Sequence, residues 1–350
     1  MEQPDTLSGA DVALLALDWG TSSLRGACLD AQGRVLQERQ FAHGILNVPA
    51  GGFARVFEEC FGDWARAAAG HARARGAGEG PPASSGPERN VGTRTGAATG
   101  PRPLCLISGM AGSRQGWVEA AYCACPAGLA DLAARLLWID DPALPLPTAI
   151  VPGLRCAHAS TVPGLASVPD VMRGEEVQVF GAMALAGWRE GLCILPGTHS
   201  KWAWVRDGRV QSFRTYMTGE FYALLGRQSL LARTLDLQAP FDPPAFALGL
   251  ARAREGAGLL HDAFGTRTLA LFERMSAGAL ASYLSGLVIG EELRGLDASG
   301  ATSLTLVGSD TLTERYALAC NSSGIPARRM GSEATWAGLR ALALHLSPGT

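Results

Sequence analysis

The sequence lacks a strong excess of charge of either sign, and it lacks any long apolar run. It contains 30 Lys and Arg residues against 32 Asp and Glu residues, a formal net charge of -2 over 350 residues. A general nucleic-acid surface needs a clustered excess of basic residues, so the composition argues against one. No uninterrupted apolar stretch approaches the ~20 residues of a membrane-spanning helix, and the opening "MEQPDTLSGAD" has neither the basic nor the apolar region of a signal peptide. We therefore expect a cytoplasmic protein with neither nucleic acid nor membrane as a partner.

The cysteine spacing of a zinc site or a disulfide framework is also missing. Of the eight cysteines, only Cys123 and Cys125 lie close together in sequence, and no second pair accompanies them. Most of the eight lie inside apolar runs. We therefore expect reduced thiols that fill the core.

The sequence does contain enough apolar residues, 47%, to build two hydrophobic cores. Residues 12–17 form a short apolar run that is typical of a central strand covered on both faces. Two more strands, 25–29 and 34–39, and an amphipathic helix, 53–69, are expected to follow. Residues 70–103 have almost no large apolar side chain and are rich in Gly, Pro, Arg and Ser, which predicts a flexible insertion.

The same order of strand, small-residue turn and two further strands recurs near residues 192–217. We therefore predict two related α/β domains with a cleft between them, spanning residues 1–189 and 190–350. The other expected elements are a strand over 148–151, a helix within 172–188, a long helix over 267–294, a strand over 303–307 and a final helix over 335–346. The final helix is a candidate to pack back on the first domain.

Two turns combine Gly, Thr and Ser directly after a predicted strand. Such turns bring backbone N–H groups and hydroxyls together, which suits phosphate oxygens. The predicted phosphate-binding residues are Gly20, Thr21, Ser22 and Ser23 in the first turn, and Gly197, Thr198, His199 and Ser200, with Lys201 after them, in the second. Asp18 would repel bare phosphate, so it predicts a divalent cation bound directly or through water. The alternative for the first turn is an ordinary hairpin.

A third turn, Gly308-Ser309-Asp310, follows the strand predicted over 303–307. It could hold the ribose or base of a nucleotide, or Ser309 could simply cap the next helix. His199, placed among hydroxyls and a lysine, is expected to bind phosphate or orient its loop rather than abstract a proton.

Six segments in this order resemble the 2-dehydro-3-deoxygalactonokinase family of the sugar-kinase, Hsp70 and actin superfamily. They are "LALDWGTSSLRGACLD", "ISGMAGSRQGW", "VMRGEEVQVFGA", "LPGTHSKW", "FRTYMTGE" and "LSGLVIGEEL". The resemblance implies ribonuclease-H-like domains with mixed sheets flanked by helices, and ATP with Mg²⁺ in the cleft between them. It also implies that Gly308 and Ser309 contact adenosine, and that Asp18 serves catalysis through the metal.

The same resemblance implies a carboxylate base at the start of the helix that follows residue 174. Related sugar kinases place an acidic base there, so Glu175 is the first candidate and Glu176 the second. The alternative is that both glutamates only complement the helix dipole.

The implied reaction transfers the γ-phosphate of ATP to the 6-hydroxyl of 2-dehydro-3-deoxy-D-galactonate, in galactonate catabolism. The carboxylate of this sugar acid needs a cationic receptor, for which Arg25 and Arg173 are the candidates, with Arg114 behind them. The backbone at Met110 and Gly112 could pass beside the sugar, and Trp117 could cover an apolar face of it.

Two other functions remain open at this point. The chain could phosphorylate another sugar or sugar acid, or it could be an ATP-dependent switch or sensor that keeps the two-domain clamp without useful transfer. The sequence leaves homo-oligomerisation undecided.

Overall fold

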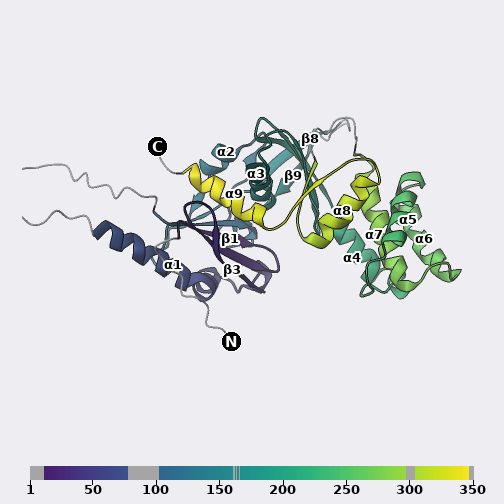
Figure 1. The fold of residues 1–350 in the computed structure, drawn as a ribbon, viewed down its shortest axis with the longest axis horizontal. Coiled ribbons are helices and arrows are strands. Elements are labelled where there is room, and N and C mark those ends of the chain that lie inside the picture. Colours follow the sequence, from purple (N-terminus) through teal and green to yellow (C-terminus); the bar gives the residue numbers. More distant parts are fainter. Residues whose placement is uncertain are drawn as a thin grey trace, which may run out of the picture. The chain divides into compact units, whose positions relative to one another are not determined.

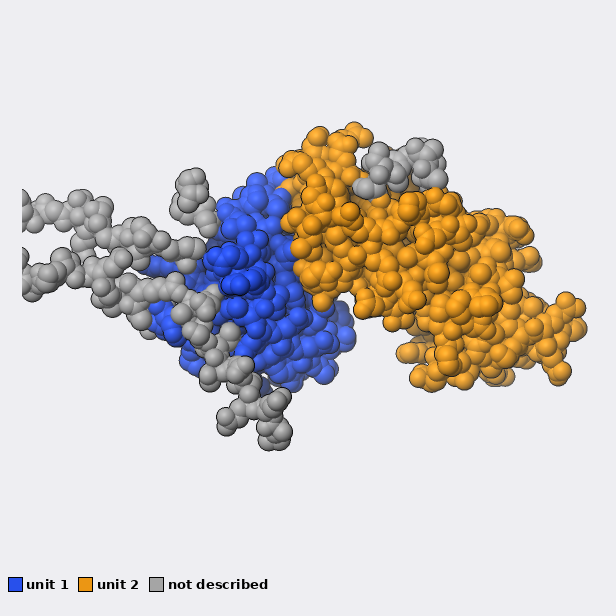
Figure 2. Space-filling model, in the orientation of Figure 1, with its two compact units in different colours: residues 1–123, 129–154, 335–350 blue, residues 124–128, 155–334 orange. Residues whose placement is uncertain are grey.

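The computed structural model describes residues 12–77, 102–160, 162, 164, 166–296 and 304–346. The chain forms two compact units, which Figure 2 shows in different colours. Unit 1 consists of residues 1–123, 129–154 and 335–350, and unit 2 consists of residues 124–128 and 155–334. Within the described residues, no helix combines the length and the apolar character needed to cross a bilayer.

This division differs from the boundary expected at residue 189. Residues 155–189 belong to unit 2, in which β9 (Ser167–Met172) contacts β12 (Arg209–Tyr216). Asp170 in β9 accepts hydrogen bonds from the backbone N–H of Thr215, at 2.8 Å, and from its hydroxyl, at 2.5 Å. The final helix, from Thr335 onwards, belongs to unit 1.

Unit 1 is built on a six-stranded mixed sheet in the order β3-β2-β1-β4-β7-β6. Its strands are β1 (Leu14–Trp19), β2 (Leu24–Leu29), β3 (Val35–Phe41), β4 (Leu104–Gly109), β6 (Leu137–Trp138) and β7 (Thr148–Ile150). Every β1 residue except Asp18 is buried, which confirms the expected central strand. β1 pairs antiparallel with β2 and parallel with β4.

Two long helices of unit 1 lie beside this sheet (Figure 1). Helix α1 (Phe53–Ala77) packs Phe57, Phe61 and Trp64 into the same core as β1. It continues eight residues beyond the predicted end at Ala69, so the segment expected to be flexible begins as helix. Alanines and arginines with good helix propensity account for this extension. Residues 78–101 of the predicted insertion lie outside the described residues. The second helix is α9 (Glu333–Leu344), with buried Trp336, Leu339 and Leu342.

Unit 2 repeats the arrangement of unit 1 in a five-stranded sheet, β12-β11-β10-β13-β14. Here β10 (Gly191–Leu195) pairs antiparallel with β11 (Ser200–Arg206) and parallel with β13 (Leu304–Val307), and β14 spans Arg328–Met330. The predicted repeat is therefore confirmed, and both units are ribonuclease-H-like. A smaller sheet, β5-β8-β9, was not predicted; it contains β5 (Cys123–Ala124) and β8 (Leu154–Ala159).

The helices of unit 2 include the predicted one within 172–188, observed as α3 (Glu175–Ala186). The others are α4 (Thr218–Gln228), α5 (Pro243–Glu255), α6 (Leu259–Leu271), α7 (Ala277–Leu293) and α8 (Asp310–Asn321). The single helix expected over 267–294 is wrong, because α6 ends at Leu271 and Glu273 adopts a positive φ of 52°. Ser276 then caps α7 by accepting a hydrogen bond from the N–H of Ala279.

Candidate active site

The first predicted phosphate turn is the loop of the β1–β2 hairpin in unit 1. Its ends are closed by a hydrogen bond from the N–H of Gly20 to the carbonyl of Ser23, at 2.8 Å. From behind, the N–H groups of Ile45 and Leu46 donate to the carbonyls of residues 20 and 21. Among the described residues, the N–H groups of residues 21–23 donate no hydrogen bond, and the side chains of Thr21 and Ser22 are exposed. The turn thus presents both donor types that bind phosphate.

These hydrogen bonds from the segment after β3 are possible because Gly44 approaches the backbone of Ser22 closely. A Cβ at Gly44 would lie 2.3 Å from the backbone of Ser22, so a larger residue would push the turn away from its support. The turn is therefore held in position by the segment that follows β3.

Asp18 stands at the end of β1 and pairs with Arg25 across the hairpin. Arg25 Nη2 lies 2.5 Å from Asp18 Oδ2, and the same guanidinium lies over the ring of Trp336 in α9, 5.9 Å from its centroid. Arg25, predicted to receive the substrate carboxylate, thus already has an anionic partner. Among the described residues no group of three or more His, Cys, Asp or Glu side chains could hold a metal ion. A cation at Asp18 would therefore take most of its ligands from phosphate and water, as Mg²⁺ commonly does.

The segment after β4 lies at the same edge of the sheet as Asp18. Gly109 pairs with Trp19 and has a φ of +88°, and a Cβ there would lie 3.2 Å from Asp18 Oδ1. Met110 is partly exposed, whereas Gly112 is buried and its carbonyl accepts from the N–H of Ala120.

Trp117 does not extend over a sugar site as we expected. Its ring stacks on Phe53, with centroids 6.3 Å apart and planes at 16°, and it meets Trp19 edge-on. These contacts place it against the core of unit 1, where apolar burial holds it.

The second predicted phosphate turn joins β10 to β11 in unit 2 and rests on the start of α4. A Cβ at Gly219 would lie 2.4 Å from the carbonyl oxygen of Gly197, and the N–H of Glu220 donates to the carbonyl of Thr198 at 3.0 Å. Thr198 is exposed, and His199 Nε2 lies 2.6 Å from Glu220 Oε2. The pairing with Glu220 fits the expectation that His199 orients this loop.

Ser200 is a correction to the predicted phosphate-binding set. Its side chain is fully buried, and its hydroxyl donates to Glu292 Oε1 at 2.7 Å. Because Ser200 is the first residue of β11, strand alternation directs its side chain into the core rather than toward the turn. We therefore exclude its hydroxyl as a phosphate ligand.

The third turn lies beside the second within unit 2. A Cβ at Gly308 would be 3.3 Å from the carbonyl oxygen of Pro196, because both turns follow neighbouring parallel strands, β10 and β13. Ser309 occupies the N-cap position of α8, but its exposed side chain accepts no capping hydrogen bond. Its hydroxyl is therefore open to solvent, beside the second turn.

Two residues predicted separately, Glu175 and Lys201, meet at the start of α3. Glu175 Oε1 lies 3.8 Å from Lys201 Nζ, and Glu175 Oε2 accepts a hydrogen bond from the N–H of Arg173 at 3.0 Å. The lysine side chain is 6% exposed and the glutamate side chain 28%. The Glu175 carboxylate thus lies next to the buried amine of Lys201, and part of it is accessible to solvent. A proton acceptor must be accessible in this way to reach the hydroxyl of a substrate.

Glu176 is a second correction, because its carboxylate faces the interior. The residue is fully buried, and the N–H of Gly174 lies 2.9 and 2.8 Å from the two carboxylate oxygens. Burial, together with the nearby charge of Glu175, raises the pKa of Glu176 to about 8. A carboxyl group enclosed in this way cannot reach a substrate hydroxyl, so Glu176 is removed as a candidate base.

The raised pKa of Glu176 predicts a pH-dependent term in stability. The ordinary pKa is 4.5 and the folded value about 8, so this stabilising term is complete below about pH 4.5 and is lost as the pH rises through 8. Glu176→Gln should remove it: the free energy of unfolding of the variant relative to wild type should rise by up to ~1.4 kcal/mol per pH unit across that window. Urea unfolding of both proteins between about pH 5 and 8 measures this. A difference that stayed constant with pH would contradict the raised pKa.

Sequence reasoning did not identify Glu220 or Glu292. Glu292 had a detectable signal, since it is one of two adjacent carboxylates at the end of the largely apolar run "LSGLVIGEEL", and a carboxylate that is buried there must find polar partners. Glu220 looked like an ordinary first-turn acid of a helix, so nothing in the sequence linked it to His199.

Comparison with known proteins finds similarity over nearly the whole chain. A family described as 2-keto-3-deoxy-galactonokinase matches residues 18–80 and 83–342. The chain is 34% identical over 340 residues to a Rhizobium meliloti (strain 1021) protein named "Probable 2-dehydro-3-deoxygalactonokinase DgoK1", covering 95% of this chain and 97% of that protein. It is 30% identical over 332 residues to the 2-dehydro-3-deoxygalactonokinase of Escherichia coli (strain K12), covering 94% of this chain and 97% of that protein.

A solved structure shares the fold as well as the sequence. It is a crystal structure of a candidate 2-dehydro-3-deoxygalactonokinase from Sinorhizobium meliloti, with a TM-score of 0.74 and 34% identity, covering 96% of this chain and 100% of that chain. The chain therefore belongs to the 2-keto-3-deoxy-galactonokinase family, a family of phosphotransferase enzymes.

Proposed function

We propose that this protein transfers the γ-phosphate of ATP to the 6-hydroxyl of 2-dehydro-3-deoxy-D-galactonate. The observation that carries the proposal is the carboxylate of Glu175, which is partly exposed at the start of α3 and lies next to the buried amine of Lys201. Family membership supports the substrate class. Phosphoryl transfer needs alignment, charge neutralisation and a late proton acceptor, and each has a candidate group here.

We assign nucleotide contacts to turns within each unit. In unit 1, the hydroxyls and N–H groups of residues 21–23 would bind phosphate oxygens. In unit 2, the turn at Gly197, Thr198 and His199 would also bind phosphate oxygens, and Gly308 with Ser309 would contact the adenosine. Lys201 would add positive charge next to the second turn. Mg²⁺, held by Asp18 directly or through water, would neutralise negative charge on the phosphates.

In this reaction the sugar acid's 6-oxygen forms a bond to the γ-phosphorus, and the bond from that phosphorus to the β–γ bridging oxygen of ATP breaks. Glu175 accepts the proton of the attacking hydroxyl, and ADP leaves. Lys201 places a positive charge 3.8 Å from the carboxylate of Glu175.

We assign recognition of the substrate carboxylate to Arg173 rather than to Arg25. Arg173 lies two residues before Glu175, and its backbone N–H donates a hydrogen bond to that carboxylate, which places it beside the candidate base. The guanidinium of Arg25 pairs with Asp18. The Met110 and Gly112 backbone remains our candidate for contact with the sugar.

Arg173→Ala should raise the KM for the sugar acid by ~10-fold or more with little change in the KM for ATP, because a two-point cationic contact to a carboxylate is lost. Arg173→Lys should have a KM for the sugar acid between that of wild type and that of Arg173→Ala. The control is Arg155→Ala, which removes an exposed arginine of β8. Steady-state kinetics measure each constant, and an unchanged KM for the sugar acid in Arg173→Ala would remove Arg173 from this role.

The function itself is tested by ADP release from purified protein with ATP, Mg²⁺ and a panel of sugar acids and sugars. The expected result is the highest kcat/KM with 2-dehydro-3-deoxy-D-galactonate. A higher kcat/KM with another acceptor would reassign the substrate. ATP binding without transfer to any acceptor would overturn the kinase assignment and leave a nucleotide-dependent switch.

A further inference from the structure

Beneath the second phosphate turn, one buried carboxylate receives four hydrogen bonds. Glu292, near the end of α7, is 5% exposed. Its Oε1 accepts from Ser200 Oγ and from Trp202 Nε1, both at 2.7 Å, and its Oε2 accepts from the hydroxyls of Thr218 and Tyr316. These four donors come from β11, α4 and α8, so a single side chain joins three elements to α7.

The geometry of this cluster gives hydrogen-bond partners to both carboxylate oxygens of Glu292. Burial raises the pKa of Glu292, and the four donated hydrogen bonds oppose that rise. The indole N–H of Trp202 can only donate, so it needs an acceptor at that position. A buried polar group whose partners are all satisfied can fix the geometry of those partners.

Two of the partners border the second phosphate turn. Ser200 directly follows His199, the last exposed residue of the turn. Thr218 directly precedes Gly219, whose Cα lies against the Gly197 carbonyl, and the next residue, Glu220, contacts both Thr198 and His199. The carboxylate of Glu292 therefore binds both the residue that follows the turn, Ser200, and the first residue of the helix on which the turn rests, Thr218.

We propose that Glu292 is a positioning residue for nucleotide binding, which sets the turn at residues 197–199 through Ser200 and Thr218. This inference rests on the proposed function, because it takes that turn to bind the phosphates of ATP. Glu292 itself faces the core and touches no substrate.

Glu292→Gln tests the inference while keeping the side-chain shape. The glutamine amide can donate where a hydroxyl of Ser200, Thr218 or Tyr316 turns to accept, but it no longer offers two acceptor oxygens. We expect ~10-fold weaker binding of a non-hydrolysable ATP analogue and a matching rise in the KM for ATP, because small displacements of a binding group carry such costs. The KM for the sugar acid should stay unchanged. Calorimetry with Mg²⁺ present and steady-state kinetics give the two readouts.

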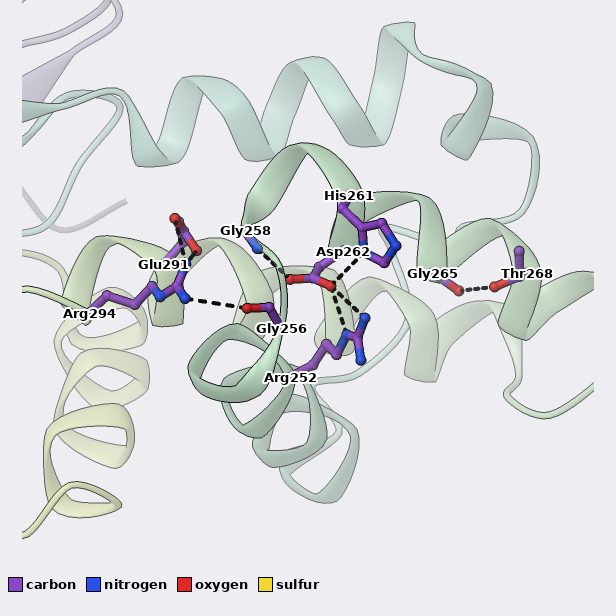
Figure 3. A network of polar contacts seen from close by, with 9 residues as sticks. All are labelled: Arg252, Gly256, Gly258, His261, Asp262, Gly265, Thr268, Glu291 and Arg294. Atoms are coloured by element: carbon purple, nitrogen blue, oxygen red, sulfur yellow. Dashed lines mark hydrogen bonds and ion pairs between the residues drawn. The ribbon is translucent and has the colours of Figure 1, made fainter.

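The matched control is another buried carboxylate of unit 2, Asp262 in α6. Figure 3 shows its side chain accepting from Arg252, His261 and the N–H of Gly258; the distances are 2.8, 3.0 and 3.0 Å. None of these partners belongs to a predicted turn. Asp262→Asn should lower the stability of the protein without a selective change in ATP affinity.

The possible results separate cleanly. Weaker nucleotide binding in Glu292→Gln but not in Asp262→Asn supports the inference. Wild-type turnover with unaltered analogue binding in Glu292→Gln would overturn this inference alone, as would an equal effect in both variants. A wild-type protein that bound no analogue would overturn both this inference and the proposed function.

A second variant tests the inference should Glu292→Gln fail to fold. Thr218→Val removes only one of the four donors, and it must still weaken analogue binding. Normal analogue binding in Thr218→Val would overturn the inference.

Discussion

Glu175→Gln is expected to lower kcat by roughly 10²–10⁴-fold, the usual contribution of a positioned general base. Glutamine keeps the length of the side chain and can still accept from the N–H of Arg173, but its amide cannot take a proton from the acceptor hydroxyl. It also loses the attraction to Lys201, 3.8 Å away. Binding of ATP and of the sugar acid should change little. Single-turnover measurement of product formation with saturating substrates isolates the transfer step.

The neighbouring Glu176→Gln is the matched control, since it changes the same functional group one residue along α3. Its carboxylate is enclosed beside Gly174, so turnover should stay close to that of wild type. Near-normal turnover in Glu175→Gln together with a large loss in Glu176→Gln would reverse our assignment. Normal turnover in both would place the base elsewhere.

Asp18→Asn is expected to lower kcat by ~10²–10³-fold at a fixed Mg²⁺ concentration, because charge stabilisation around the transferring phosphoryl group is lost. An amide in place of the carboxylate is a poor ligand for a hard cation. Part of the loss should therefore be recovered at higher Mg²⁺. The measurement is kcat as a function of Mg²⁺ concentration for wild type and variant.

Asp30→Asn supplies the control for this experiment. Asp30 also pairs with an arginine on the β1–β2–β3 meander, with Arg34 Nε 2.6 Å from its Oδ2, but it lies at the opposite end of β2 from the turn. Loss of that ion pair should lower the stability of the protein and leave the dependence of kcat on Mg²⁺ concentration unchanged. An unchanged kcat and an unchanged Mg²⁺ requirement in Asp18→Asn would remove the metal role from Asp18.

The repeated strands and turns could be predicted because their signals are local. Short apolar runs that end in glycine and hydroxyl residues occur at Trp19 and Leu195, and both proved to be central strands next to a hairpin. The break between α6 and α7 could not be predicted in the same way. Residues 272–275 are compatible with a helix, and only tertiary packing and the cap at Ser276 end one helix and start the next.

Side-chain direction was the weaker part of the site prediction. Thr198 and Ser200 are two residues apart in a segment rich in small polar residues, yet one is exposed and the other lies in the core. The strand begins at Ser200, and a shift of one residue in that boundary reverses which hydroxyls face the turn. Glu175 and Glu176 differ for a similar reason, since successive helical positions point about 100° apart.

The chain order of unit 1 has a consequence for biosynthesis. This unit is assembled from three separate stretches, the last of which, from Thr335, supplies Trp336 under the guanidinium of Arg25. During translation the ribosome must complete all of residues 155–334 before that stretch exists. The segment around Asp18 and Arg25 therefore lacks its contact with Trp336 until all of residues 155–334 have been made, whereas the two predicted turns of unit 2 precede Trp336 in the chain.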